Sequence, residues 1–338
     1  MSTTTTARAW TDCTWNPLRG CSRVSTGCEH CYAERQAGRF SAPGQPYAGL
    51  VRKTAQGWRW TGVVRLIAHE LETPLRWTKP RRIFVTAMSD LFQESVSEDL
   101  LDAIVAVMAL APQHTFQVLA KRPARMLAYL TERWPPTRAP VVAVSGTRRD
   151  RPVETPGADR HQQILNAADR LLHGPLGAQA RFWAPDGRPR SHAQPWPLPH
   201  VWWGVSVENQ TTAEARLPWL LQTPAAVRFV SYEPALGPVD FSPYLDEHGW
   251  PMAGSHRGLD WIIAGGERGP AARPCDLAWL RSVVQQCQTA DVACFIKQLG
   301  SHAYEAARRV WLRHQAGADP AAWPAELRCQ QFPKGPQG

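Results

Sequence analysis

Three cysteines crowd into eleven residues near the start of the chain. The segment reads Cys21-Ser-Arg-Val-Ser-Thr-Gly-Cys28-Glu-His-Cys31, which is a C-x6-C-x2-C spacing. Such crowding favours metal binding over disulfide cross-linking. Three thiolates on one loop can bind three irons of a [4Fe–4S] cluster and leave the fourth iron open. We therefore expect Cys21, Cys28 and Cys31 to be metal ligands and a [4Fe–4S] cluster to be the cofactor.

The residues around these cysteines suit that chemistry. A helix is predicted over Cys31–Ala37, so Cys28 and Cys31 come at its start, three residues apart, with both sulfurs on one face. The N–H groups at a helix N-terminus stabilise thiolate and cluster charge. Gly20 and Gly27 flank the loop and allow the backbone to turn tightly.

Zinc is the main alternative to an iron–sulfur cluster. A structural zinc site needs four ligands, often from two C-x2-C pairs, and this segment has one such pair. His30 lies inside the pair and is expected to point elsewhere, so Cys13 is the better fourth ligand. The plainest alternative is three unliganded thiols. We interpret the scattered Cys275, Cys287, Cys294 and Cys329 as ordinary thiols.

Strand-length apolar runs alternate with helical patterns along the chain, as in a parallel sheet or an α/β barrel. A short first strand is expected around Thr14–Trp15, and the later runs are Val63–Ile67, Arg82–Ala87, His114–Leu119, Val201–Val207, Val227–Ser231, Trp261–Ala264 and Ala293–Ile296. The predicted helices are Ser97–Leu110, Pro123–Leu130, Arg160–Leu172, Thr212–Leu221 and Asp276–Thr289. The number of units predicts an α/β fold, a full or partial TIM-like (β/α) barrel.

Two stretches interrupt this alternation. Residues 134–199 are rich in Pro, Arg and Gly and are interpreted as an insertion, acting as a lid or a partner surface. The chain after Ser301 carries a weak helical pattern over Ala303–His314. The predicted organisation is therefore a barrel domain over residues 1–300 that contains the insertion, and a C-terminal extension over 301–338.

Polar residues follow each predicted strand, where the chemistry of α/β barrels gathers. Together they would form a charged mouth suited to a zwitterionic cofactor and a polar substrate. The alternative is that these acids and bases pair with one another in structural ion pairs. The candidate cofactor-binding residues are Ser89, Asp90, Lys121, Glu208, Glu233, Gly265, Gly266, Glu267 and Lys297.

Composition and charge limit the class of protein. Hydrophobic residues make up 43% and charged residues 20% of 338, which is a globular composition. The formal charge of +9 permits an anionic partner such as nucleic acid. No run of 18 apolar residues occurs, and residues 1–9 lack the apolar core of a secretory signal. We expect a cytoplasmic protein without membrane contact.

The cysteine loop, set after a first strand and before repeated β/α units, resembles the radical S-adenosylmethionine (SAM) superfamily. The usual spacing there is C-x3-C-x2-C, so the first gap of six residues is a departure. The chain also resembles a phage-associated family of unknown function with a three-cysteine motif. The matching segments cover most of residues 10–300 and include Trp10-Thr-Asp12, Thr14-Trp-Asn-Pro17, Cys31-Tyr-Ala-Glu-Arg35, Met88-Ser-Asp-Leu-Phe92, Phe116–Pro123, Gly204–Asn209, Phe229–Pro234, Gly265-Gly-Glu267 and Lys297-Gln298.

The resemblance implies a cofactor and a reaction type. The open iron would bind SAM, and a 5′-deoxyadenosyl radical would abstract hydrogen from a substrate, with nucleic acid or a nucleotide as the first candidate. Such an enzyme needs an electron donor protein as a partner. A Gly-Gly-Glu stretch similar to Gly265–Glu267 helps to hold the SAM amino group in that superfamily, usually earlier in the barrel. The other hypotheses are a metal-stabilised nucleic-acid-binding protein without catalysis, and an interaction protein that uses the insertion to bind a partner protein.

Overall fold

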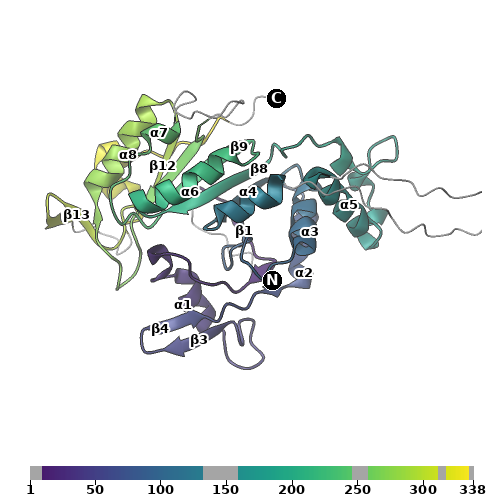
Figure 1. Ribbon diagram of the computed structural model, residues 1–338, viewed down its shortest axis with the longest axis horizontal. Coiled ribbons are helices and arrows are strands. Elements are labelled where there is room, and N and C mark those ends of the chain that lie inside the picture. Colours follow the sequence, from purple (N-terminus) through teal and green to yellow (C-terminus); the bar gives the residue numbers. More distant parts are fainter. Residues whose placement is uncertain (1–9, 132–158, 246–257, 311–316, 335–338) are drawn as a thin grey trace, which may run out of the picture.

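A curled sheet of seven parallel strands forms the centre of the molecule (Figure 1). The computed structural model describes residues 10–131, 159–245, 258–310 and 317–334. The strands follow one another in the order β1 (Cys13–Trp15), β6 (Arg82–Val85), β7 (Thr115–Ala120), β8 (Val201–Val207), β9 (Val227–Tyr232), β10 (Trp261–Gly265) and β12 (Ala293–Gln298). Every neighbouring pair is parallel, and β1 and β12 are the two edges. The partial (β/α) barrel predicted from the alternation is confirmed.

Helices connect successive strands. They are α3 (Glu98–Ala109), α4 (Pro123–Thr131), α6 (Gln210–Gln222), α7 (Ser242–Leu245) and α8 (Leu277–Thr289). In α3, acidic Glu98 and Asp99 occupy the first turn, and the apolar side chains at helical spacing are buried against the sheet. A capping box between Asn209 and Thr212 begins α6, and the Asp276 side chain caps α8.

The two faces of the sheet carry different cores. Aromatic side chains fill the lower part of the concave face, among them Trp10, Trp202, Phe229, Trp261 and Phe295. The convex face packs against the helices. Consecutive residues of a strand point to opposite faces, and Trp202 and Trp203 do so as expected, because Trp203 belongs to the convex core.

A small layer is inserted between β1 and β6, seen as the purple elements below the sheet in Figure 1. It holds α1 (Tyr32–Gly38), the hairpin of β3 (Val51–Thr54) and β4 (Gly57–Trp60), and the antiparallel pair of β2 (Leu18–Arg19) and β5 (Arg65–Leu66). Three short helices also occur here: η1 (Thr26–Cys28), α2 (Ala68–Leu71) and η2 (Thr73–Arg76). The predicted strand Val63–Ile67 is wrong as a member of the main sheet. Only Arg65 and Leu66 are extended there, and both side chains are exposed.

Part of the predicted insertion contributes to the body of the molecule. Residues 134–158 lie outside the described part of the chain, whereas α5 (Arg160–Leu172) packs against α3. Three short 3₁₀ helices follow, η3 (Pro175–Ala178), η4 (Ala180–Phe182) and η5 (Arg190–Ala193). Arg160 is 1% exposed and donates to Asp102 Oδ1 at 2.8 Å, so a buried ion pair fixes α5 in place.

The helix predicted over Ala303–His314 is wrong. Its described part is a hairpin of β13 (Ala303–Glu305) and β14 (Arg308–Arg309), and β13 also pairs with β11 (Cys275–Asp276). The turn residues Ala306 and Ala307 have φ values of 47° and 62°. Two consecutive left-handed residues make a hairpin turn, although alanine seldom adopts that conformation. The helix-forming composition of this stretch is therefore overridden by strand pairing.

The C-terminal extension covers the free edge of β12. It contains η6 (Pro320–Ala322) and η7 (Ala325–Leu327), followed by an antiparallel bridge between Gln330 and Phe295. Covering an edge strand removes a row of unpaired backbone groups.

Across the ranges that the structure describes, no helix has the length and apolar character needed to cross a membrane.

Candidate functional site

A cavity of about 1340 Å³ opens at the carboxyl ends of the strands, above the aromatic lower part of the concave face. Trp10, Phe84 and Leu119 contribute its apolar wall, and Ser206 and Ser231 contribute polar groups. Cys28 and Cys31 line the same cavity as five of the nine predicted strand-end residues, which are Lys121, Glu233, Gly266, Glu267 and Lys297. The fold thus brings two of the three loop cysteines together with the strand ends.

Cys21 is not among the residues that line the cavity. It packs with Cys31 against a small apolar cluster that includes Met88 and Trp60. Burial raises the pKa of Cys21 to about 12, the Asp90 carboxylate adds to that effect, and Arg122 opposes it. Charge on Cys31 and Cys28 raises it further, so the three sulfurs lie within electrostatic range of one another.

Cys31 precedes α1 at the N-cap position. Burial raises the pKa of its thiol, and the backbone N–H groups of Glu34 and Ala33 in the first turn act in the opposite direction. These N–H groups therefore favour the thiolate form that metal binding requires.

The spacing of the thiols bears on the kind of metal group that they fit. Among residues 10–131, 159–245, 258–310 and 317–334, no three Cys, His, Asp or Glu side chains surround one point closely enough to hold a metal ion. Every ligand of a zinc ion lies within about 2.3 Å of one atom, whereas the thiolates of a [4Fe–4S] cluster each bind a different iron. The expectation of a metal group on Cys21, Cys28 and Cys31 therefore stays a prediction.

The proposed fourth zinc ligands lie elsewhere. Cys13 is on β1 opposite Ile83 and is buried in the convex core, and Cys21 and Cys31 pack in a different cluster. His30 Nδ1 lies 2.9 Å from Glu267 Oε2, so the histidine inside the C-x2-C pair turns to the barrel rim. His30 therefore has a carboxylate partner at the rim, and it lines the cavity together with Cys28 and Cys31.

Buried Glu34 holds the cysteine loop to α1 and the β3–β4 hairpin. Arg23, between Cys21 and Cys28, donates to both Glu34 oxygens at 3.0 and 2.6 Å. The backbone N–H of Trp60 also donates to Glu34 at 3.0 Å. Glu34 stands in the Cys31–Arg35 motif, so that motif supplies the anchor of the loop as well as one of its cysteines.

Glu208 at the end of β8 supports the loop from below. An added Cβ at Gly27 would lie 2.2 Å from Glu208 Oε1, so only glycine fits there. Ser25 Oγ donates to Glu208 at 3.2 Å, and Lys121 and Arg216 form ion pairs with it at 3.3 and 3.0 Å. Burial would raise the pKa of Glu208, but Lys121 and Arg216 together hold it below its ordinary value.

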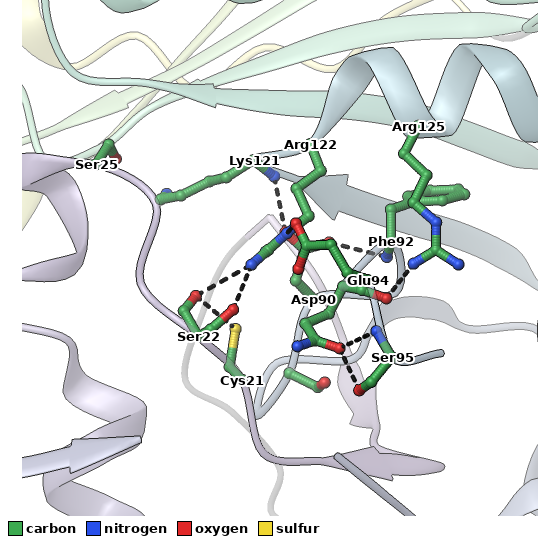
Figure 2. Close-up of polar contacts among 12 residues, drawn as sticks. Cys21, Ser22, Ser25, Asp90, Phe92, Glu94, Ser95, Lys121, Arg122 and Arg125 are labelled. Carbon is green, nitrogen blue, oxygen red and sulfur yellow. Dashed lines mark hydrogen bonds and ion pairs between the residues drawn. The ribbon is translucent and has the colours of Figure 1, made fainter. Parts of the chain in front are cut away.

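A second network ties the loop to β6 and β7 (Figure 2). Arg122 donates to Asp90 at 2.9 Å, to Glu94 at 2.7 Å and to Ser22 Oγ at 2.6 Å. Asp90 also accepts from the backbone N–H groups of Phe92 and Lys121, and Ser89 Oγ donates to the Gly20 carbonyl at 2.6 Å. Ser89 and Asp90, predicted as cofactor-binding residues, therefore fix the position of the loop.

Glu267 links the opposite rim to the loop. Arg273 donates to both Glu267 oxygens at 3.0 and 2.7 Å, and its other nitrogen donates to the Thr26 carbonyl at 2.9 Å. Burial would raise the pKa of Glu267, but hydrogen bonds from Arg273 and His30 hold it below the ordinary value. Sequence reasoning missed Arg273 because nothing in its Pro- and Ala-rich surroundings distinguishes it.

The remaining strand-end residues line the wall next to β12. Glu233 accepts hydrogen bonds from Lys297 Nζ and, at 2.8 Å, from Gln298 Nε2. Gly265 and Gly266 lie against the backbone of Gln298 and Leu299, where an added Cβ would approach oxygens at 2.9 and 2.4 Å. The Gly-Gly pair therefore allows the neighbouring strand end to approach closely.

The strand-end acids and bases thus pair with one another, as the alternative interpretation expected, and several of them also face the cavity. Ser89, Asp90, Glu208 and Gly265 lie outside its lining. This combination defines a class: a partial (β/α) barrel protein whose strand-end cavity is covered on one side by a three-cysteine loop.

The comparisons with known proteins give a family. A family model described as "Protein of unknown function (DUF5131)" matches residues 5–319, so the chain belongs to that family. Searches of curated proteins and of solved structures each return no match.

Proposed function

We propose that this protein is a radical SAM-like iron–sulfur enzyme that holds a [4Fe–4S] cluster on Cys21, Cys28 and Cys31. The observation that carries the proposal is that Cys28 and Cys31 line one cavity with Lys121, Glu233 and Lys297. Active sites of (β/α) barrels are found at this end of the strands. When bound, the cluster would supply the electron that splits SAM into methionine and a 5′-deoxyadenosyl radical.

The charged residues of the cavity suit the amino-acid part of SAM. Lys121 and Lys297 present ammonium groups that would attract its carboxylate, and Glu233 and Glu267 present carboxylates for its amino group. Hydrogen bonds from Arg273 and His30 hold the pKa of Glu267 below its ordinary value, which favours the charged carboxylate. Glu208 and Asp90 would act indirectly, by holding Lys121 and Arg122 in place.

The cavity has room for a substrate beside SAM. Its volume of about 1340 Å³ is larger than the roughly 300–1,000 Å³ of ordinary ligand sites. Arg35 and Arg268 line it as well, and Trp10 offers an aromatic face. With the formal charge of +9, these features favour a nucleotide or a nucleic acid as substrate. The reaction also requires an electron donor protein.

The test is anaerobic reconstitution with iron and sulfide, followed by reduction and measurement of 5′-deoxyadenosine formed from SAM. We expect about four irons per chain and SAM cleavage, both lost in Cys28→Ser. Cys329→Ser, which changes a half-buried cysteine outside the loop, is the matched control and should retain both. A colourless protein with one zinc and no SAM cleavage would instead favour a metal-stabilised nucleic-acid-binding protein.

A further inference from the structure

Three cysteines far apart in the sequence meet beside the edge strand β12. Cys287 lies in the last turn of α8, Cys294 lies in β12, and Cys329 lies in the C-terminal segment. Cys329 Sγ donates to the Cys294 carbonyl oxygen at 3.3 Å, and the thiols of Cys287 and Cys329 both lie close enough to that of Cys294 to shift its pKa. The sequence suggested scattered ordinary thiols, and the fold gathers them.

The backbone places Cys294 and Cys329 on one face of a short antiparallel pair. Ile296 N–H donates to the Cys329 carbonyl and Gln331 N–H to the Cys294 carbonyl, each at 2.8 Å. Because the bridge joins Phe295 to Gln330, Cys294 and Cys329 are diagonal neighbours whose side chains point to the convex core. The 3.3 Å contact of Cys329 Sγ with the Cys294 carbonyl oxygen brings the Cys329 side chain up to Cys294.

Cys329 and Cys294 differ in exposure and in pKa. In a redox pair, the more exposed and more acidic thiol is the nucleophile, and the other is the resolving thiol. Cys329 is half-buried, and Cys294 is 1% exposed. A hydrogen bond from Cys294 lowers the pKa of Cys329 to about 7, with help from the Gln331 N–H and against burial. Hydrogen bonds with Cys287 and Cys329, together with burial, raise the pKa of Cys294 well above its ordinary value. The more acidic thiol is therefore on the more accessible of the two cysteines.

These thiols do not form a metal site in the part of the chain that the structure describes, where no such group could hold an ion. We propose that Cys294 and Cys329 are a reversible redox pair that a hydroperoxide converts into a disulfide. The Cys329 thiolate attacks the peroxide, so an S–O bond forms as the O–O bond breaks and hydroxide leaves. The Cys294 sulfur then displaces water from the sulfenic acid. Overall, two thiols and one hydrogen peroxide give one disulfide and two waters.

The disulfide would lock the C-terminal segment onto the sheet. Phe332 packs on Trp261 and Phe295, with ring centroids 5.3 and 5.5 Å apart, and Trp261 Nε1 donates to the Gln331 carbonyl at 2.9 Å. Oxidation would therefore link the C-terminal segment covalently to β12. That segment would then stay packed on the edge of β12 and on the aromatic cluster of Trp261 and Phe295. A cross-link between residues 294 and 329 also restricts the unfolded chain.

The test uses the full-length protein, treated with hydrogen peroxide, alkylated, and digested with trypsin and an Asp-specific protease. This digestion puts Cys287, Cys294 and Cys329 on separate peptides, within residues 282–290, 291–297 and 329–334. We expect a cross-linked peptide joining 291–297 to 329–334 that dithiothreitol separates, and a higher Tm of the oxidised protein. A Cys287–Cys294 cross-link with free Cys329, or loss of Cys329 to sulfonic acid without cross-linking, would overturn the proposal.

Variants separate the roles of the three thiols. In Cys294→Ser, dimedone should trap Cys329 as sulfenic acid, and no cross-link should form. In Cys287→Ser, the matched control, the Cys294–Cys329 cross-link should form as in the unmodified chain. If Cys287→Ser abolishes it while the protein keeps its Tm, Cys287 is the true partner and the proposed pair is wrong. These outcomes are independent of whether the loop cysteines bind a cluster.

Discussion

At the scale of single residues, the position of the cysteine loop depends on Gly27. A Gly27→Ala methyl group would lie 2.2 Å from Glu208 Oε1, and that carboxylate is held by Lys121 and Arg216. We expect a loss of about 1–3 kcal/mol of unfolding free energy, as for overpacking, and a lower iron content after reconstitution. Denaturant unfolding and iron analysis provide the measurement.

Gly174→Ala is the matched control for Gly27→Ala. Its added Cβ would make ordinary contact with the Leu171 carbonyl at 3.5 Å, so stability and iron content should both stay close to those of the unmodified chain. Equal effects of the two variants would show that Gly27 has no particular role in placing the loop.

The charge of Glu208 makes the stability of the folded protein depend on pH. Its pKa in the folded protein lies below the ordinary value of 4.5, so its contribution to stability is complete above about pH 4.5 and is lost as pH falls through the folded pKa. Glu208→Gln leaves Lys121 and Arg216 without their buried partner, and we expect a loss of about 3–5 kcal/mol at pH 7.

The difference between Glu208→Gln and the unmodified chain should shrink as pH falls below 4.5, because the native carboxylate becomes protonated. Denaturant titrations at several pH values measure it. Glu214→Gln, on the exposed side of α6, is the control and should change stability by no more than about 0.5 kcal/mol. A difference that does not depend on pH would contradict the assigned role of the Glu208 charge.

At the scale of elements, the buried Arg160–Asp102 pair attaches α5 to α3. Arg160 also donates to the Tyr129 carbonyl at 2.7 Å. Arg160→Met would leave the Asp102 charge uncompensated, and we expect a loss of about 3–5 kcal/mol in denaturant unfolding. Arg170→Met, on the exposed face of the same helix, should stay within about 0.5 kcal/mol. Similar behaviour of the two variants would mean that α5 is not part of the core.

Helices and strands whose own residues carry a clear hydrophobic pattern could be predicted from the sequence. Val201–Val207 is a near-continuous apolar run, broken by Gly204 and Ser206, and is buried at every position in β8. The first-turn acids and the apolar spacing of α3 are equally local signals. Ala303–His314 could not be read this way, because Ala306 and Ala307 adopt left-handed conformations that only the pairing of β13 with β14 and β11 explains.

The candidate site was predictable in its residue types and less so in its contacts. The polar residues after each strand do gather at one end of the half-barrel. Whether a given carboxylate faces the cavity or supports the loop depends on partners remote in sequence, as Glu208 with Gly27 and Glu267 with Arg273 show. The Cys287–Cys294–Cys329 group was missed for the same reason, since it forms across three segments.

At the scale of the whole molecule, the half-barrel leaves the upper end of its concave face open, and the cysteine loop covers part of that opening. Contacts from the ends of β7 and β8 and from the segment after β10 hold the loop in this place: Arg122 donates to Ser22, Ser25 donates to Glu208, and Arg273 donates to the Thr26 carbonyl and pairs with Glu29. In the proposed function, this arrangement would place a metal group at the mouth of a cavity that could also hold an organic cofactor. We therefore expect this group to have an open iron that SAM can reach.

The most direct test is electron paramagnetic resonance of the anaerobically reconstituted, dithionite-reduced protein with and without SAM. We predict a reduced [4Fe–4S] signal that changes on addition of SAM and is absent in Cys28→Ala. A cluster signal that SAM leaves unchanged, or a colourless protein that retains one zinc, would contradict the proposed radical SAM function.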